Sequence, residues 1–194
     1  MFSYQPFSQE CTDALNRVVA YHLHTSHVYL AMAYSFRNDK RIPPFVEYFE
    51  TLANTRREDA DAFLKHLWKR NTAICPPTLE KVDMMEITTP IEAILLAQEM
   101  ERTLTSILVG LQGAARRESD LLRLLTSVLR KQRKNEDYMK TQLTFHQRVE
   151  KEREMQVQTK KPSTLLNRKP YLRGRKHIGD HEVSGLRGFV TSDC

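Results

Sequence analysis

Apolar residues recur every three or four positions over most of the chain, which is the period of an amphipathic helix. Ser8, a favourable N-cap residue, precedes the first such stretch, in which Leu15, Val18, Val19 and Leu23 follow this spacing. Proline and glycine, which interrupt helices, are absent from residues 7–42, 45–75 and 114–161. The pattern predicts four long helices, at about Ser8–Arg37, Pro44–Arg70, Thr89–Gly113 and Ser119–Glu154.

The lengths of the connections predict how these helices are arranged. About six residues join the first helix to the second and the third to the fourth, so each pair is expected to form an antiparallel hairpin. About 18 residues, 71–88, separate the second helix from the third, and a link of that length can run the full length of a bundle. The sequence therefore predicts an all-α four-helix bundle of two antiparallel hairpins joined by one long crossover.

Composition narrows the class of protein. The chain has 194 residues, 40% hydrophobic and 28% charged, and no apolar run approaches the roughly 18 residues of a membrane span, so a membrane partner is not expected. The N-terminus resembles no secretory signal, and the cysteines, Cys11, Cys75 and Cys194, have no metal-binding spacing. We therefore expect free thiols and a cytoplasmic protein.

The positive charge is concentrated at the C-terminus. Residues 1–150 carry 20 Lys and Arg against 19 Asp and Glu, whereas residues 151–194 carry 10 against 5. We expect a bundle domain over residues 1–155 and a basic, disordered tail over residues 156–194. Because the body is nearly neutral and the basic clusters of the tail lack interleaved aromatic residues, a nucleic-acid partner is not expected.

Several motifs resemble those of animal ferritin subunits. Leu15-Asn16-Arg17 and the stretch from Ser26 to Phe36 are similar to the Ile-Asn-Arg and Ser-Tyr-Val-Tyr-Leu-Ser-Met-Ser-Tyr-Tyr-Phe of the ferritin first helix. The second and third ferritin helices are matched by Phe45–Phe49, Arg57-Glu58 and Met100–Arg102, and the C-terminus by Tyr171-Leu172 and His177–Asp180. The resemblance covers about residues 4–180.

What this resemblance implies is a ferritin-like four-helix bundle and a role in intracellular iron storage and iron homeostasis. Iron would be the bound metal, and the partners would be ferritin heavy or light subunits, or copies of this chain, in a shell of twenty-four subunits. The short fifth helix of the family would be degraded, because Pro170 and Gly174 interrupt the matching segment.

The resemblance also places a former di-iron centre. Ferritin heavy subunits supply a glutamate and a tyrosine from the first helix, Glu-x-x-His from the second, a glutamate from the third and a glutamine from the fourth. The matching residues here are His22, Tyr29, Arg56, Asp59, Glu101 and Asn135. Arg56 has no lone pair to offer a cation. We therefore expect no catalytic residue, a buried Arg56–Glu101 ion pair, and the light-subunit-like absence of ferroxidase activity.

Two other interpretations of the sequence stay open. His22, Asp59 and Glu101 are a set of ligands that iron or zinc could accept at a single site, which would make the chain a residual metal oxidase or ferroxidase. Alternatively, the basic tail could make the chain a binding protein for nucleic acid or acidic partners.

The resemblance places two further groups of residues. On the mineral-nucleating face of the second helix only two acids remain, Glu58 and Asp61, so weak nucleation is expected. At the positions that line the three-fold channels of ferritin the chain has Leu125 and Val128, which would make such channels apolar.

Overall fold

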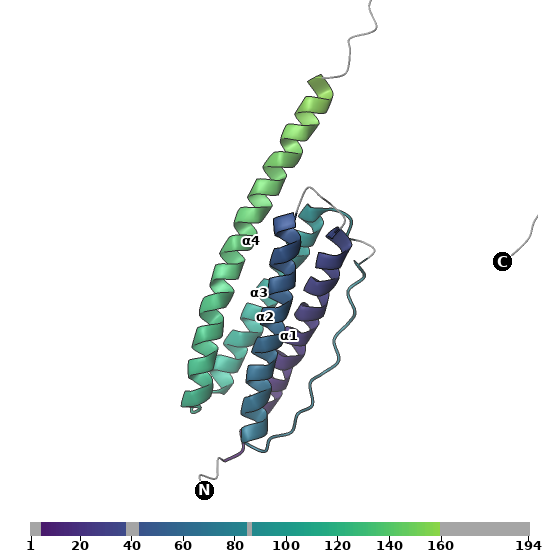
Figure 1. The fold of residues 1–194 in the computed structure, drawn as a ribbon. Helices are drawn as coiled ribbons and strands as arrows, with labels where there is room; N and C mark the ends of the chain where they lie inside the picture. Colours follow the sequence, from purple (N-terminus) through teal and green to yellow (C-terminus); the bar gives the residue numbers. More distant parts are fainter. Residues whose placement is uncertain (1–4, 38–42, 85–86, 160–194) are drawn as a thin grey trace, which may run out of the picture.

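The structure, a computed structural model, describes residues 5–37, 43–84 and 87–159. These residues form four helices: α1 (Gln9–Phe36), α2 (Pro43–Lys69), α3 (Pro90–Ala114) and α4 (Ser119–Thr159). Figure 1 shows α1 beside α2 and α3 beside α4, with the crossover between α2 and α3 running along the bundle. The predicted all-α bundle of two hairpins is confirmed.

The ends of the helices follow from local side-chain chemistry. The Ser8 hydroxyl accepts a hydrogen bond from the Cys11 amide at 3.2 Å, as expected of an N-cap residue. At the start of α3, Thr89 and Glu92 form a reciprocal capping box, with Pro90 in the first turn. These contacts satisfy amide groups that have no partner within the helix, and so fix where α1 and α3 begin.

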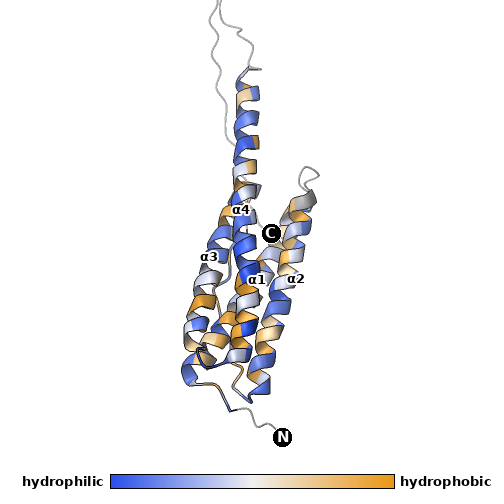
Figure 2. Ribbon diagram, turned by 90° about the vertical axis from the view of Figure 1, so that its left-hand side faces the viewer, coloured by the Kyte–Doolittle hydropathy of each residue, from blue (hydrophilic) through white to orange (hydrophobic). Residues whose placement is uncertain are grey.

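Helix α4 is longer than the sequence indicated. It continues to Thr159, beyond the predicted boundary at residue 155, and extends past the end of the other three helices (Figure 1). Figure 2 shows hydrophilic residues dominating this extension. The disordered tail was predicted from residue 156, but residues 156–159 form the end of α4; the rest of that tail and the degraded fifth helix lie outside the described part of the chain.

The core consists of two apolar clusters separated by a buried polar layer. One cluster contains Leu15 of α1 and Phe63 of α2, and the other contains Met32 of α1 and Phe49 of α2. On each helix, one or two buried polar residues fall between the parts that enter the two clusters: His22 and Thr25 on α1, Arg56 and Asp59 on α2, Glu101 on α3 and Gln132 on α4. None of the described helices is both long and apolar enough to cross a membrane.

The burial of Leu125 and Val128 contradicts the prediction that they line a channel between subunits. Both side chains belong to the first apolar cluster, with 0% and 2% of their surface exposed. A residue that packs into the core of its own subunit cannot line a channel between subunits without leaving that core. The three-fold-channel assignment was therefore wrong for these two positions.

Candidate functional site in the buried polar layer

All four helices contribute side chains to the polar layer. Five of the six residues predicted for the former di-iron centre lie there, each at most 5% exposed, and the sixth place is taken by a residue that the sequence analysis missed. The layer contains His22 and Tyr29 from α1, Arg56 and Asp59 from α2, Glu101 from α3 and Gln132 from α4.

The predicted ion pair between Arg56 and Glu101 is present, with both side chains fully buried. Nη2 of Arg56 donates to Oε2 of Glu101 and, at 2.6 Å, to Oε1 of Gln132. The Tyr29 hydroxyl donates to Oε1 of Glu101. Nε2 of Gln132 also donates to Oε2 of Glu101, at 2.7 Å. The Glu101 carboxylate therefore accepts hydrogen bonds from the three other helices.

Asn135 was the wrong choice for the fourth helix. It is only half-buried, whereas Gln132, three residues earlier, is fully buried and bonded to Glu101. The prediction assumed an ungapped register for α4, and a three-residue change moves the contact by about one turn and rotates it by about 60°. The sequence did carry a signal, because Gln132 is the polar member of the buried stripe Leu121, Leu125, Val128, Gln132 and Met139.

The second half of the layer is centred on Asp59. Its Oδ2 lies 4.0 Å from Nε2 of His22 and 3.9 Å from Nη1 of Arg56, and its Oδ1 lies 3.7 Å from Nζ of Lys131. Nδ1 of His22 is 2.9 Å from the Val18 carbonyl oxygen, so neutral His22 donates there and its Nε2 is an acceptor. Among the described residues, these facing atoms of His22, Asp59 and Arg56 have no hydrogen-bond partner.

Burial and neighbouring charges set the protonation states of the layer. Burial, reinforced by the Arg56 charge, lowers the pKa of His22 to about 3. Burial alone would lower the pKa of Arg56, but the Glu101 carboxylate raises it overall, so the guanidinium stays protonated. Burial raises the pKa of Asp59, and burial together with Glu101 raises the pKa of Tyr29 well above its usual value. Near neutral pH, His22 is neutral and Tyr29 is a hydrogen-bond donor.

The residues of the layer do not fit a di-iron centre. Arg56 cannot bind a cation and places a fixed positive charge among the other side chains. Both oxygens of Glu101 accept hydrogen bonds within the network. Within the described ranges, no three His, Cys, Asp or Glu side chains are grouped so that they could hold a metal ion. His22 and Asp59 face each other, but Glu101 does not join them as a third ligand.

The burial of neutral His22 predicts how the stability of the fold depends on pH. Its pKa is about 3 in the folded chain and about 6.5 when unfolded, so between these values the unfolded chain binds the extra proton. At a pH above the unfolded pKa, His22 therefore does not change the free energy of unfolding. As the pH falls below that pKa, His22 lowers the free energy of unfolding. We expect a loss of about 2 kcal/mol between pH 7 and pH 5 in urea denaturation.

His22→Asn should remove most of that pH dependence, since the asparagine amide can still donate to the Val18 carbonyl. The raised pKa of Asp59 has the opposite effect on stability, because the folded chain binds a proton at Asp59 more readily than the unfolded chain does. This effect arises just above the usual pKa range of carboxyl groups, so the destabilisation by His22 is clearest in the higher part of the pH range. His27→Asn is the matched control, because His27 is exposed on the same helix. Equal slopes for wild type and His22→Asn would contradict this assignment.

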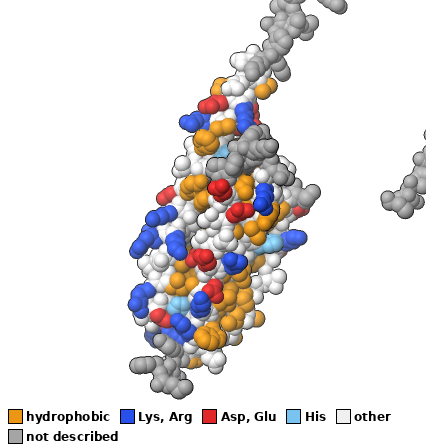
Figure 3. All heavy atoms as spheres, viewed as in Figure 1, with side chains coloured by type: hydrophobic (Ala, Val, Ile, Leu, Met, Phe, Trp, Pro, Cys, Tyr) orange, Lys and Arg blue, Asp and Glu red, His pale blue; other side chains and the backbone are white. Residues whose placement is uncertain are grey.

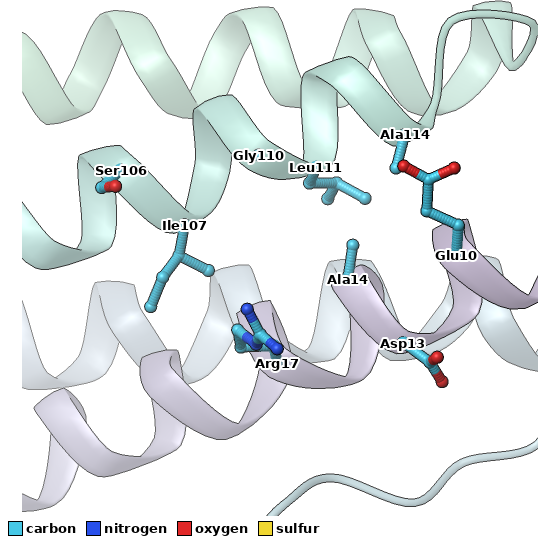
Figure 4. Close-up of a pocket in the computed structure, with 9 residues that line it drawn as sticks. All are labelled: Glu10, Asp13, Ala14, Arg17, Ser106, Ile107, Gly110, Leu111 and Ala114. Atoms are coloured by element: carbon cyan, nitrogen blue, oxygen red, sulfur yellow. The ribbon is translucent and has the colours of Figure 1, made fainter.

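Two other features lie outside the polar layer. Glu58 and Asp61, the remaining acids of the nucleating face, are exposed on α2, and Asp61 pairs with Lys65 at 2.6 Å. A groove of about 350 Å³ separates α1 from α3, where Arg17 and Ile107 point into the space between the helices (Figure 4). No residue of the polar layer lines that groove, so the candidate site is the layer itself.

Comparison with known proteins agrees with this architecture. A family model described as a ferritin-like domain matches residues 12–149. The chain is 31% identical over 117 residues to a ferritin heavy chain of Echinococcus granulosus, covering 60% of this chain and 68% of that protein. It is 28% identical over 117 residues to the ferritin lower subunit of Aquarana catesbeiana, with the same two coverages. Since the family model spans well over half of the sequence and the bundle has the expected helices, the chain belongs to the ferritin family.

Proposed function

We propose that this chain is a subunit of a ferritin-type iron store, with iron as its cargo and without a ferroxidase centre of its own. The observation that carries the proposal is the fully buried Arg56 guanidinium, bonded to Glu101 and Gln132 where iron ligands would have to converge. Binding ferrous ions there would require removing a buried positive charge from its partner. That step leaves Glu101 or Arg56 unpaired, at a cost of several kcal/mol.

The cations beside Asp59 also disfavour a residual metal oxidase. Asp59 is already close to two cations, Arg56 and Lys131, so a metal ion beside it would meet their repulsion. His22 supplies one acceptor nitrogen, which by itself holds no metal at useful affinity. The alternative of a partner bound through the basic tail concerns residues 160–194, outside the described part of the chain.

An exposed apolar stripe on α1 supports assembly with other subunits. Leu23, Leu30 and Tyr34 follow helical spacing and are 43%, 44% and 56% exposed. Leu23 also borders a surface hollow together with Pro76 and Leu79 of the crossover. Such a stripe is typical of a surface that another protein covers. We infer that it contacts a second copy of this chain or another ferritin subunit, in a cytoplasmic ferritin shell.

Native mass measurement tests the assembly. The full chain, alone or refolded together with a ferroxidase-active ferritin heavy subunit, should give shell-sized particles that contain it. Leu30→Arg/Tyr34→Arg should shift the chain to smaller species without changing its helical content. The control Val109→Arg alters an exposed apolar residue of α3 and should leave the mass unchanged. A chain that stays monomeric alone and never enters mixed particles would contradict the proposal.

A further inference from the structure

The bundle as a whole is nearly neutral, but one part of its surface is strongly basic. Residues 116–134, which cover the turn after α3 and the N-terminal half of α4, contain seven Lys and Arg but only two acids, Glu118 and Asp120. Both acids pair with Arg70 of α2, at 2.8 and 3.2 Å, and Asp120 also lies 3.4 Å from His66. They are therefore engaged by α2 and do not neutralise the cations of α4.

Six of these seven cations are exposed and have no carboxylate oxygen within 4.0 Å among the described residues; the seventh, Lys131, pairs with Asp59. We call the six the basic face: Arg116, Arg117, Arg123, Arg130, Arg133 and Lys134. Figure 3 shows Lys and Arg side chains gathered along the left-hand edge of the molecule, where Figure 1 places α4.

The rest of α4 shows that this arrangement is not a general property of the helix. In its C-terminal half the basic residues have acids one turn away, as in Lys140–Asp137, Arg148–Glu152 and Arg153–Glu150. That spacing is the usual way in which exposed helices balance their charge. Acids also lie one turn from Arg123, Arg133 and Lys134, but they are engaged elsewhere. Asp120 pairs with Arg70, Glu136 accepts a hydrogen bond from Thr105, and Asp137 pairs with Lys140. The like charges of the basic face therefore repel one another unless an anion binds.

The spacing of the basic face matches an extended anion. Arg123, Arg130 and Lys134 are separated by seven and four residues and therefore share one side of α4, with exposed Ser127 between them. The eleven steps from Arg123 to Lys134 span about 17 Å along the helix axis, which corresponds to about five base-pair steps of B-form DNA. A single small anion could contact Arg130 and Lys134, which are one turn apart, but not Arg123, which lies two turns from Arg130.

We propose that the basic face binds the phosphodiester backbone of duplex nucleic acid without sequence preference. Five of its six residues are arginines, whose planar guanidinium groups bind phosphate oxygens in a bidentate manner. Residues 116–134 include no aromatic side chain, so there is no platform on which the bases of a single strand could stack. This inference is independent of whether the polar layer oxidises iron. The expectation that nucleic acid is not a partner was based on the nearly neutral charge of residues 1–150 as a whole. That sum counts the cations of the basic face together with acids elsewhere on the bundle.

Fluorescence anisotropy of a labelled 20-base-pair DNA duplex of random sequence, titrated with the full chain at several salt concentrations, tests the proposal. Arg123→Gln/Arg130→Gln/Lys134→Gln should weaken binding at least tenfold near 0.1 M salt. It should also reduce the slope of log K against log salt by about 2.7, since each lost phosphate contact removes about 0.9. The matched control, Arg57→Gln/Lys69→Gln/Lys81→Gln, removes the same charge from exposed cations of α2 and the crossover and should change the affinity less than twofold.

Four outcomes would overturn the proposal. Equal losses in the two triple variants would mean that only net charge matters. A loss confined to Lys160→Gln/Lys161→Gln/Arg168→Gln/Lys169→Gln would assign binding to the tail. Tighter binding of single-stranded DNA than of the duplex would exclude a backbone-only contact, and equally tight binding of a poly-glutamate peptide would indicate an acidic protein partner. Circular dichroism melts of each variant confirm that these exposed substitutions leave the fold intact.

Discussion

Replacing Glu101 by alanine should lower the free energy of unfolding by about 3–5 kcal/mol, because it leaves the fully buried Arg56 guanidinium without its carboxylate. The loss includes the hydrogen bonds that Tyr29 and Gln132 donate to the same carboxylate, so three other helices are affected together. Urea denaturation followed by circular dichroism measures it directly. Glu150→Ala, at an exposed acid of α4, should change stability by no more than about 0.5 kcal/mol.

Removing both charges separates the ion pair from the surrounding hydrogen bonds. Arg56→Leu/Glu101→Leu should recover only part of the loss, because the Tyr29 hydroxyl and Oε1 of Gln132 then lack partners, while Nε2 of Gln132 can still donate to the backbone carbonyl of residue 101. Adding Tyr29→Phe and Gln132→Leu should bring stability close to wild type, since apolar groups of similar volume avoid the cost of burying polar ones. A Glu101→Ala loss no larger than that of Glu150→Ala would show that the pair does not hold the bundle together.

Restoring the ligand types expected of a di-iron centre should create iron oxidation where we expect none. The variant His22→Glu/Arg56→Glu/Asp59→His removes the guanidinium and supplies two new carboxylates and an imidazole beside Glu101, Tyr29 and Gln132. Ligands would then converge from all four helices. Oxygen consumption after addition of ferrous iron should become saturable, whereas Arg56→Ala alone, which removes the charge but adds no ligand, should stay at the buffer rate.

A second measurement keeps this rescue experiment decisive if the triple variant is unstable. Added ferrous iron or zinc should raise its melting temperature by mass action, because the folded state alone presents the complete ligand set. Wild type and Arg56→Ala serve as controls and should show no such rise. A folded triple variant that neither oxidises iron nor gains stability from metal would mean that the site has been misplaced.

The sequence predicted the four helices and their hairpins because both depend on local signals. Proline positions, the Ser8 and Thr89 caps and the apolar period are properties of short segments, and the length of the crossover constrains the topology. The Arg56–Glu101 pair could also be predicted, since a buried guanidinium needs a carboxylate and Glu101 was the nearest candidate. These inferences did not require the exact register between helices.

The predictions that failed did require that register. Asn135 was chosen instead of Gln132, and Leu125 and Val128 were assigned to channels, because an ungapped match of α4 to the family was assumed. The contact of Lys131 with Asp59 depends on how closely α2 and α4 approach, which no single helix pattern reveals. The basic face was missed for a related reason, since net charge says nothing about which acids are already paired with Arg70.

Aerobic oxidation of ferrous iron by the purified, full-length chain tests the central claim most directly. Because Arg56 occupies the place where iron ligands would converge, the protein should consume oxygen no faster than a protein-free buffer at every iron-to-protein ratio. Rapid oxygen consumption that saturates at a pair of irons per subunit, and that is lost in Glu101→Ala, would contradict the claim and restore an oxidase function to the polar layer.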